Sequence, residues 1–264
     1  MDGRGDLRSG LVAYADKNNG IVEKDYLVSA FDGLGFLYGQ ITFYLGFTPH
    51  KHEGKITGLA AFGNYKKTIQ IFKNIVKVKN GKIRCKLGVY RPFYTNLSKE
   101  LILKLKKHKR EDVAAGLQKH CEEIIVQWIK YWLKKNNNVK DVCLAGGVFG
   151  NVKINQEIAQ IKGLRNMYVF PHMADGGIPY GSAALAYFEK KRISKVKFDN
   201  MYSGLEFTEL EIKKSILKSK KLIKFKKLKN KSTYVAKQLI NKKIIGIFNG
   251  KMEYGPRALG NRSI

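Results

Sequence analysis

The spacing of apolar positions changes along the chain and predicts alternating strands and helices. Apolar and polar residues alternate on both sides of Asn80-Gly81, from position 75 to position 87. Both central residues of a type I′ turn need a positive φ, which Asn-Gly adopts readily, so this segment predicts a β-hairpin. An earlier hairpin is predicted where a strand at residues 11–15 is followed by Asn18-Asn-Gly20 and Ile21-Val22.

One long amphipathic helix is predicted for residues 112–135. Its apolar residues recur every three or four positions and define one buried face. These residues are Val113, Leu117, Cys121, Ile124, Ile125, Trp128 and Trp132. Because both tryptophans lie on this face, we assign them to the core rather than to a ligand platform.

A second helical stretch is predicted for residues 26–45. It overlaps an uncharged segment, residues 33–50, which approaches the length of a membrane span. Several residues in that segment are small or polar, namely Gly33, Gly35, Gly39, Gly46, Gln40, Thr42 and Pro49. They favour a buried, glycine-rich helix inside a globular core over a membrane span.

The later part of the chain alternates short apolar strands with helices. Strands are predicted at residues 142–145, 167–170, 223–228 and 244–248, and helices after Asn151 and at residues 178–189, 208–218 and 233–241. The composition shifts after Arg192, and we place a domain boundary near residue 197. Such alternation is typical of an α/β fold with a partly parallel sheet.

The charge of the chain is strongly positive. Its 50 Lys and Arg residues against 21 Asp and Glu residues give a formal net charge of +29. Most of the excess is lysine, in runs such as residues 104–110 and 218–231, where Phe225 alone could serve as an aromatic platform. Nucleic-acid surfaces usually interleave arginines with aromatic residues. We therefore favour a solvated, lysine-rich surface, while attraction of RNA or anionic substrates at low salt stays open.

Composition also indicates a cellular compartment. The three cysteines, Cys85, Cys121 and Cys143, form no Cys-x-x-Cys pair, so neither a disulfide framework nor a structural zinc site is predicted. The first ten residues contain no apolar segment of the kind found in secretory signals. We expect a protein of the reducing cytoplasm.

Two glycine-containing loops follow the predicted strands of the middle region. Residues 144–151 (Leu-Ala-Gly-Gly-Val-Phe-Gly-Asn) precede a helix, so their backbone amides suit an anion, although tight strand-to-helix packing also explains such glycines. Asn151 adds a side-chain donor where a nucleotide could lie. The second loop, residues 171–177, should leave the same sheet edge. Its Asp175 is either a cation ligand or a helix cap.

Two further segments gather charged side chains. His50-Lys-His-Glu-Gly-Lys55 has only two local imidazoles, so a solvated loop or a loop that meets a polar ligand is favoured over a metal site. The final loop, residues 250–263, places Lys251, Arg257 and Arg262 around a rigid Gly-Pro pair. Arginine binds phosphate and carboxylate in a bidentate manner, so we predict an anion-binding loop. The sequence itself identifies no catalytic residue.

These segments, in this order, resemble the O-carbamoyltransferase family of nodulation-factor and antibiotic biosynthesis, which is related to the tRNA threonylcarbamoyl transferases. The matching stretches are residues 2–6 (Asp-Gly-Arg-Gly-Asp), 46–63, 144–151, 175–185 and 252–264 (Met-Glu-Tyr-Gly-Pro-Arg-Ala-Leu-Gly-Asn-Arg-Ser-Ile). The resemblance implies an α/β chain in which residues 1–197 are the later part of an actin-like, sugar-kinase-like (ASKHA) carbamoyl-transfer domain. Residues 198–264 would begin a smaller α/β domain that processes carbamoyl phosphate.

The resemblance further implies a reaction and its residues. ATP and carbamoyl phosphate would give carbamoyl adenylate, and the carbamoyl group would pass to a hydroxyl of a small molecule or glycan. A divalent metal, usually Fe(II), assists this transfer in the family. Carried over by position, Asp175 would be a metal ligand, and Gly146, Gly147, Val148 and Asn151 would form the adenylate-binding loop, with Gly54 close to the nucleotide. Lys251, Arg257 and Arg262 would bind the phosphate of carbamoyl phosphate.

The chain also departs from the family pattern. None of its five histidines supplies the His-x-x-x-His motif that holds the metal in the family. We therefore expect a piece of a longer enzyme, incomplete at both ends and inactive by itself. Neither a nucleic acid nor a membrane is expected as a partner under this hypothesis. The alternative hypothesis is a basic tRNA- or RNA-binding relative of the threonylcarbamoyl-tRNA modification enzymes.

Overall fold

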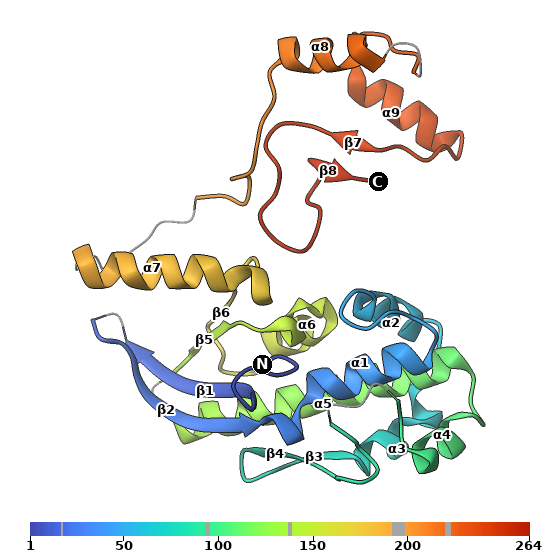
Figure 1. Cartoon of the computed structure of the whole chain (residues 1–264). Helices are drawn as coiled ribbons and strands as arrows, with labels where there is room; N and C mark the ends of the chain where they lie inside the picture. Colours follow the sequence, from blue (N-terminus) through green and yellow to red (C-terminus); the bar gives the residue numbers. More distant parts are fainter. Residues whose placement is uncertain (17, 93–95, 137–138, 192–198, 220–222) are drawn as a thin grey trace. The chain divides into compact units, whose positions relative to one another are not determined.

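A computed structural model describes residues 1–264 apart from 17, 93–95, 137–138, 192–198 and 220–222. The chain divides into two compact units, Met1–Ser194 and Lys195–Ile264, and both appear in Figure 1. The boundary predicted near residue 197 lies outside the described residues. The structure is a mixed α/β arrangement, and each unit is described below by itself.

The first unit contains most of the regular structure. In chain order its main elements are β1 (Arg8–Asp16), β2 (Gly20–Ser29), α1 (Leu34–Tyr44), α2 (Glu53–Ala60), α3 (Ile69–Lys73), β3 (Val76–Lys79), β4 (Lys82–Cys85), α4 (Lys99–Leu105), α5 (Arg110–Lys135), β5 (Asp141–Leu144), α6 (Val152–Ala159), β6 (Asn166–Val169) and α7 (Ile178–Lys191). The described strands of this unit form three two-stranded sheets: β1 with β2, β3 with β4, and β5 with β6.

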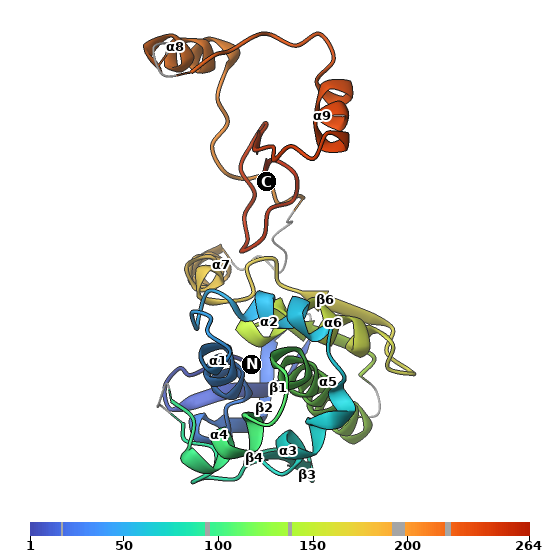
Figure 2. The ribbon, with the colours of Figure 1, turned by 90° about the vertical axis from the view of Figure 1, so that its right-hand side faces the viewer.

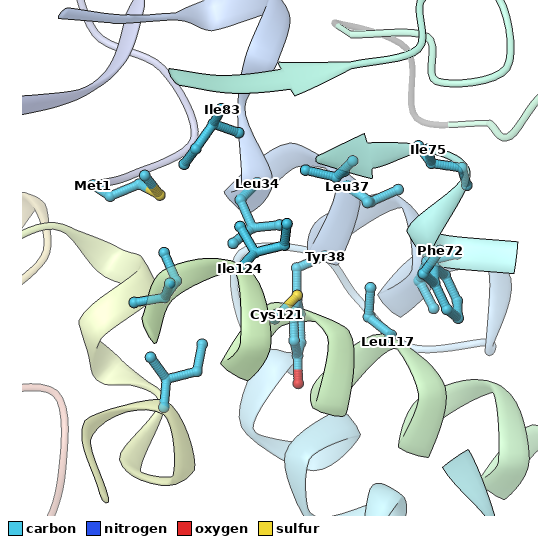
Figure 3. Packing of buried hydrophobic residues seen from close by; sticks show 14 of the residues in the cluster. Met1, Leu34, Leu37, Tyr38, Phe72, Ile75, Ile83, Leu117, Cys121 and Ile124 are labelled. Atoms are coloured by element: carbon cyan, nitrogen blue, oxygen red, sulfur yellow. The ribbon is translucent and has the colours of Figure 1, made fainter. Parts of the chain in front are cut away.

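Helix α5 is the central element of the first unit, and α1, α2, α3 and α6 all contact it (Figure 2). Its predicted apolar face is buried, as Figure 3 shows for Leu117, Cys121 and Ile124. Burial of large apolar side chains contributes about 1.5–3 kcal/mol each, so this face dominates the packing of the unit. Trp128 is only 4% exposed, which confirms its assignment to the core.

The hairpin predicted at Asn80-Gly81 is confirmed. Strands β3 and β4 pair antiparallel, and Asn80 and Gly81 have φ values of 50° and 70°. The carbonyl of Gly81 accepts hydrogen bonds of 3.1 Å from the indole N–H groups of both Trp128 and Trp132. A Cβ at Gly81 would lie 2.2 Å from the Tyr131 ring, so this turn requires glycine.

The helical stretch predicted from residue 26 is wrong in its first part. Strand β2 continues to Ser29, because Tyr26, Leu27 and Val28 pair with β1. Ser29 then caps a short 3-10 turn by accepting a hydrogen bond from the Phe31 N–H, and α1 begins only at Leu34. A short apolar segment fits a strand or a helix equally well, and pairing with β1 decides between them.

Helix α1 is a buried core helix, as predicted. Leu34, Leu37 and Ile41 are almost fully buried, and a Cβ at Gly35 would lie 2.9 Å from the backbone oxygen of Asp2. Close approach of these two backbones therefore explains the glycine. Among the described helices none combines the length and the apolar character that a bilayer crossing requires.

The predicted strand–helix–strand unit of the middle region is confirmed. Strands β5 and β6 pair in parallel, with Asp141 opposite Asn166 and Leu144 opposite Val169. Helix α6 lies between them in sequence and packs on α5 through Ile154 and Ile158, both of which are buried. The carboxyl ends of both strands therefore lie at one edge of the sheet.

In the second unit the described residues form helices α8 (Glu209–Ser219) and α9 (Lys231–Ile240), close to the predicted ranges. Strand β7 (Ile247–Phe248) pairs antiparallel with β8 (Arg262–Ser263). The strand predicted at residues 223–228 is wrong, because these residues form no regular element, and the one predicted at 244–248 is shorter than expected. Apolar alternation alone does not make a strand when no described neighbour pairs with it.

Titration of His120 should make the stability of the first unit depend on pH. His120 is 3% exposed, its Nε2 lies 3.0 Å from the Val76 oxygen, and within the described structure its Nδ1 is buried without a hydrogen-bond partner. Burial lowers the pKa of this imidazole below its usual value. The unfolded state therefore binds a proton more readily, and the free energy of unfolding should fall as the pH drops below about 6.5.

Urea denaturation between pH 7.5 and 5.5 tests this expectation. The His120 contribution approaches about 1.4 kcal/mol per pH unit, the value for one proton. His120→Asn should flatten the dependence, since its amide does not titrate. An unchanged slope in this variant would assign the pH dependence to other groups.

Candidate functional site

The two glycine-containing loops meet at the carboxyl edge of β5 and β6. The Gly146 N–H donates to the Met173 oxygen at 2.5 Å, and the Phe170 N–H donates to the Leu144 oxygen at 3.1 Å. A Cβ at Gly147 would lie 3.9 Å from the Ala174 side chain. The prediction that both loops leave the same edge is therefore confirmed. Ligands of open α/β sheets bind at such edges.

The double glycine also packs tightly against the first residues of the chain. Gly146 has a φ of 104°, and a Cβ there would lie 2.0 Å from the Met1 oxygen. The same oxygen accepts a hydrogen bond from the Val148 N–H at 3.3 Å. Gly146 thus serves close backbone packing, one of the two explanations that the sequence left open. Gly147 is exposed, although the side chain of Asp2 lies near it.

Asn151 joins the loop to two helices. Its Oδ1 caps α6 by accepting from the N–H groups of Lys153 and Ile154, at 3.1 and 3.2 Å. Its Nδ2 donates to Gln118 Oε1 at 2.8 Å and to Thr57 Oγ1 at 3.3 Å. Both ends of the amide therefore have partners within the protein. Asn151 shapes the loop, and a direct contact with a nucleotide stays a prediction.

Sequence reasoning missed the partners of Asn151. Gln118 lies on α5 and is 5% exposed, and Tyr38 on α1 donates to Gln118 Oε1 at 2.8 Å. The signal available in the sequence was a polar residue directly beside the apolar positions of the predicted long helix, with a carboxylate four residues later at Glu122. Buried amides need hydrogen-bond partners, so such a residue marks a polar network within the core.

The histidines of residues 50–55 act as turn residues. Thr48 N–H donates to His52 Nδ1 at 3.1 Å, and His50 N–H donates to Glu53 Oε1 at 2.6 Å. These bonds order the entry to α2, where Gly54 is exposed in the first turn. Thr57, one turn later on α2, is the residue that reaches Asn151.

The donors expected for a metal ion are incomplete in the described structure. Asp175 is exposed in the short 3-10 turn (Asp175–Gly177) that precedes α7. Across the described residues, no group of three or more His, Cys, Asp and Glu side chains is placed to hold a metal ion. Ferrous sites need several such donors, so one carboxylate does not suffice. These residues do not fit the metal by themselves, and the role of Asp175 stays a prediction.

A carboxylate organises the final loop of the second unit. Glu253 Oε1 accepts hydrogen bonds from the N–H groups of Leu259, Asn261 and Arg262, at 2.9, 2.7 and 3.1 Å. Burial of Glu253 would raise its pKa, but the three N–H donors outweigh that effect and hold the pKa at about 2. The sequence contained this residue within the motif but indicated no role for it.

The three predicted anion-binding side chains have different surroundings. Arg262 stacks on the Phe248 ring, 3.6 Å from its centroid, and donates to backbone oxygens that include those of Asn249 and Gly250. Lys251 and Arg257 are exposed. Arg262 therefore holds the loop, whereas Lys251 and Arg257 lie on its surface. Anion binding by the three residues stays a prediction.

The chain matches two family models. The model described as Carbamoyltransferase N-terminus matches residues 1–184, and the model described as Carbamoyltransferase C-terminus matches residues 236–264. The first match covers nearly all of the first unit, and the second contains the Glu253 loop.

Curated relatives come from an archaeon and from bacteria. The chain is 33% identical to the uncharacterized protein MJ1058 of Methanocaldococcus jannaschii, over 96% of this chain and 42% of that protein. It is 32% identical to MJ1051 of the same organism, over 100% of this chain and 51% of that protein. Nodulation protein NolO of Bradyrhizobium diazoefficiens is 25% identical, over 100% of this chain and 48% of that protein.

The chain thus spans about half the length of the curated relatives that it matches. The N-terminal family model alone covers more than half of the chain, and the C-terminal model follows it in the expected order. These matches show that the chain belongs to the carbamoyltransferase family.

Proposed function

We propose that this chain is part of an enzyme that transfers a carbamoyl group from carbamoyl phosphate, through carbamoyl adenylate, to a hydroxyl of a small molecule or glycan. Under this proposal residues 1–197 belong to an actin-like (ASKHA) transfer domain, and residues 198–264 begin the domain that uses carbamoyl phosphate. The single observation that carries the proposal is the meeting of the two glycine-containing loops at one sheet edge in a carbamoyltransferase-family chain.

The adenylate would bind where the loop and α2 present exposed backbone. Gly147 and Gly54 are both exposed, and neither has a side chain to obstruct a ligand. Three other residues fix the loop to the rest of the first unit. Gly146 bonds to Met173, Val148 to Met1 and Asn151 to Gln118. The N–H groups of Gly146, Val148, Lys153 and Ile154 already have partners within the protein. A phosphate at this edge would therefore meet the exposed backbone of Gly147 and the partial positive charge of the α6 N-terminus.

The chemistry of the reaction fits these residues. In carbamoyl adenylate the carbonyl carbon carries a phosphate leaving group, so a substrate hydroxyl can displace AMP from it. The protein must hold the phosphate and stabilise the negative charge that develops on oxygen. The residues of this chain position the phosphate and orient the loop.

Lys251 and Arg257 are the side chains proposed to meet the phosphate of carbamoyl phosphate. Both are exposed on a loop that Glu253 and Arg262 hold in shape. Because Glu253 already accepts three backbone N–H groups, the external anion would be bound by cationic side chains rather than by those amides. Charge-assisted hydrogen bonds from arginine suit this task.

Pyrophosphate exchange tests the proposed reaction. We expect a natural longer protein that contains this chain to exchange labelled pyrophosphate into ATP only when carbamoyl phosphate is present. The measurement is the rate of label incorporation with and without carbamoyl phosphate. No exchange, together with salt-sensitive tRNA binding, would instead support the RNA-binding alternative, which the net charge of +29 leaves open.

The anion role of Arg257 has a separate test. Arg257→Ala in the same longer protein should raise the half-saturating concentration of carbamoyl phosphate about tenfold or more, the usual effect of losing a charged hydrogen bond. Lys214→Ala, on the exposed surface of α8, is the matched control for removal of one positive charge. Equal effects of the two variants would contradict direct binding by Arg257 and would mean that only its positive charge contributes.

Acid titration tests the role of Glu253. Its pKa is lowered from the usual 4.5 to about 2, so the carboxylate stabilises the loop above pH 4.5 and this stabilisation is lost as the pH falls toward 2. The amide resonances of Leu259, Asn261 and Arg262 should therefore titrate together with a midpoint near pH 2. Glu253→Gln should abolish that titration. A midpoint near 4.5 would mean that the carboxylate does not accept these three bonds.

A further inference from the structure

The side-chain amide of Gln118 is fully engaged inside the first unit. Its Oε1 accepts from Tyr38 Oη and from Asn151 Nδ2, each at 2.8 Å. Its Nε2 donates to Glu122 Oε1 at 2.9 Å and to Asn151 Oδ1 at 3.2 Å. A carboxamide has two donor protons and an oxygen with two lone pairs. All of this capacity is therefore used, at a residue that is 5% exposed.

These bonds connect four segments that are distant in sequence. Tyr38 belongs to α1, Thr57 to α2, and Asn151 to the loop before α6, while Gln118 lies on α5 between them. Tyr38 Oη and Thr57 Oγ1 are 3.0 Å apart, and Thr57 Oγ1 also accepts from Asn151 Nδ2 at 3.3 Å. The polar cluster therefore links α2 to the double-glycine loop, the two segments of the proposed adenylate site.

Glu122 fixes the direction of the amide of Gln118. Its carboxylate can only accept, so the Nε2 side of Gln118 must face it and the Oε1 side must face Tyr38 and Asn151. Because Gln118 Oε1 accepts, Asn151 must turn its Nδ2 donor toward it. Asn151 Oδ1 then faces α6 and caps that helix. Glu122 thus fixes the orientation of the Gln118 amide, and Gln118 in turn fixes the orientation of the Asn151 amide.

Tyr38 supports the same direction. Burial raises the pKa of its hydroxyl well above the usual value, so the group stays a neutral donor. Figure 3 shows its ring beside Cys121, with the hydroxyl pointing away from Leu34 and Leu37. The proton of Tyr38 goes to Gln118 Oε1, and its oxygen is left to accept from Thr57.

We propose that Gln118 is a positioning residue that orients Asn151 and thereby holds the double-glycine loop in register with α2 for an adenine nucleotide. The identity of the ligand in this inference rests on the proposed function, whereas the orientation of Asn151 by Gln118 rests on the hydrogen bonds above. Gln118 itself does not touch the ligand. It acts through Asn151, because Asn151 is the residue that carries the loop into α6.

Removal of the hydrogen bonds at Gln118 gives the test. Gln118→Met keeps the length of the side chain and removes its donors and acceptors. Gln127→Met, at an exposed position of the same helix, is the matched control. In the whole 264-residue chain, the Nδ2 proton resonances of Asn151 should shift and exchange faster with water in Gln118→Met, and should stay unchanged in Gln127→Met.

The ligand arm of the test uses AMP as the probe. Gln118→Met should weaken AMP binding by about fivefold to tenfold, the cost of one lost buried hydrogen bond. Asn151→Ala should weaken it as well, and the double variant should be no weaker than Asn151→Ala, because the two residues act in series. Additive effects would overturn the proposal, and so would AMP affinity that does not change in Gln118→Met.

Two further outcomes separate this inference from the proposed function. If the unaltered chain does not bind AMP, the nucleotide assignment fails, while a shift of the Asn151 resonances in Gln118→Met still supports the positioning of the loop. If those resonances do not change, the positioning role fails even where AMP binds. Should Gln118→Met not fold, Gln118→Leu replaces it. Its apolar side chain makes none of these hydrogen bonds, so the same shift of the Asn151 resonances is expected and an unchanged spectrum overturns the proposal.

Discussion

Burial of one face of α5 is the constraint on which the rest of the first unit depends. Its apolar residues pack against α1, α2, α3, β3 and α6, so segments that are far apart in sequence share one helix as their support. The same helix carries Gln118 at the border of its apolar face. A single element therefore supplies both the core and the polar contact that reaches the edge of the β5–β6 sheet.

Local signals that carry their own physical cause were predictable from the sequence. Asn80-Gly81 specifies a hairpin because both residues accept a positive φ, and the α5 pattern specifies a buried face because its period matches the helix. Residues 26–29 and 223–228 were not predictable in the same way. The presence of a pairing partner decides whether such segments become strands, and apolar alternation does not reveal the partner.

For the candidate site, the sequence identified the loops but not the contacts that hold them. The resemblance implied that Gly146 and Asn151 line the adenylate site, and the structure shows the contacts of both residues within the protein. Gly146 packs against Met1, and Asn151 bonds to Gln118 and Thr57. Arg262 and Glu253 show the same pattern in the second unit, where they satisfy backbone groups of their own loop. Motif residues can thus preserve the shape of a site, while exposed neighbours such as Gly54, Gly147 and Arg257 stay accessible to a ligand.

The central claim is that the edge formed by the double-glycine loop and α2 receives an adenylate. Titration of the isotopically labelled chain with AMP, followed by the amide resonances of Gly54 and Gly147, tests it most directly. The account predicts that both resonances shift together with one dissociation constant. Resonances of Gly54 and Gly147 that stay fixed at saturating AMP would contradict it.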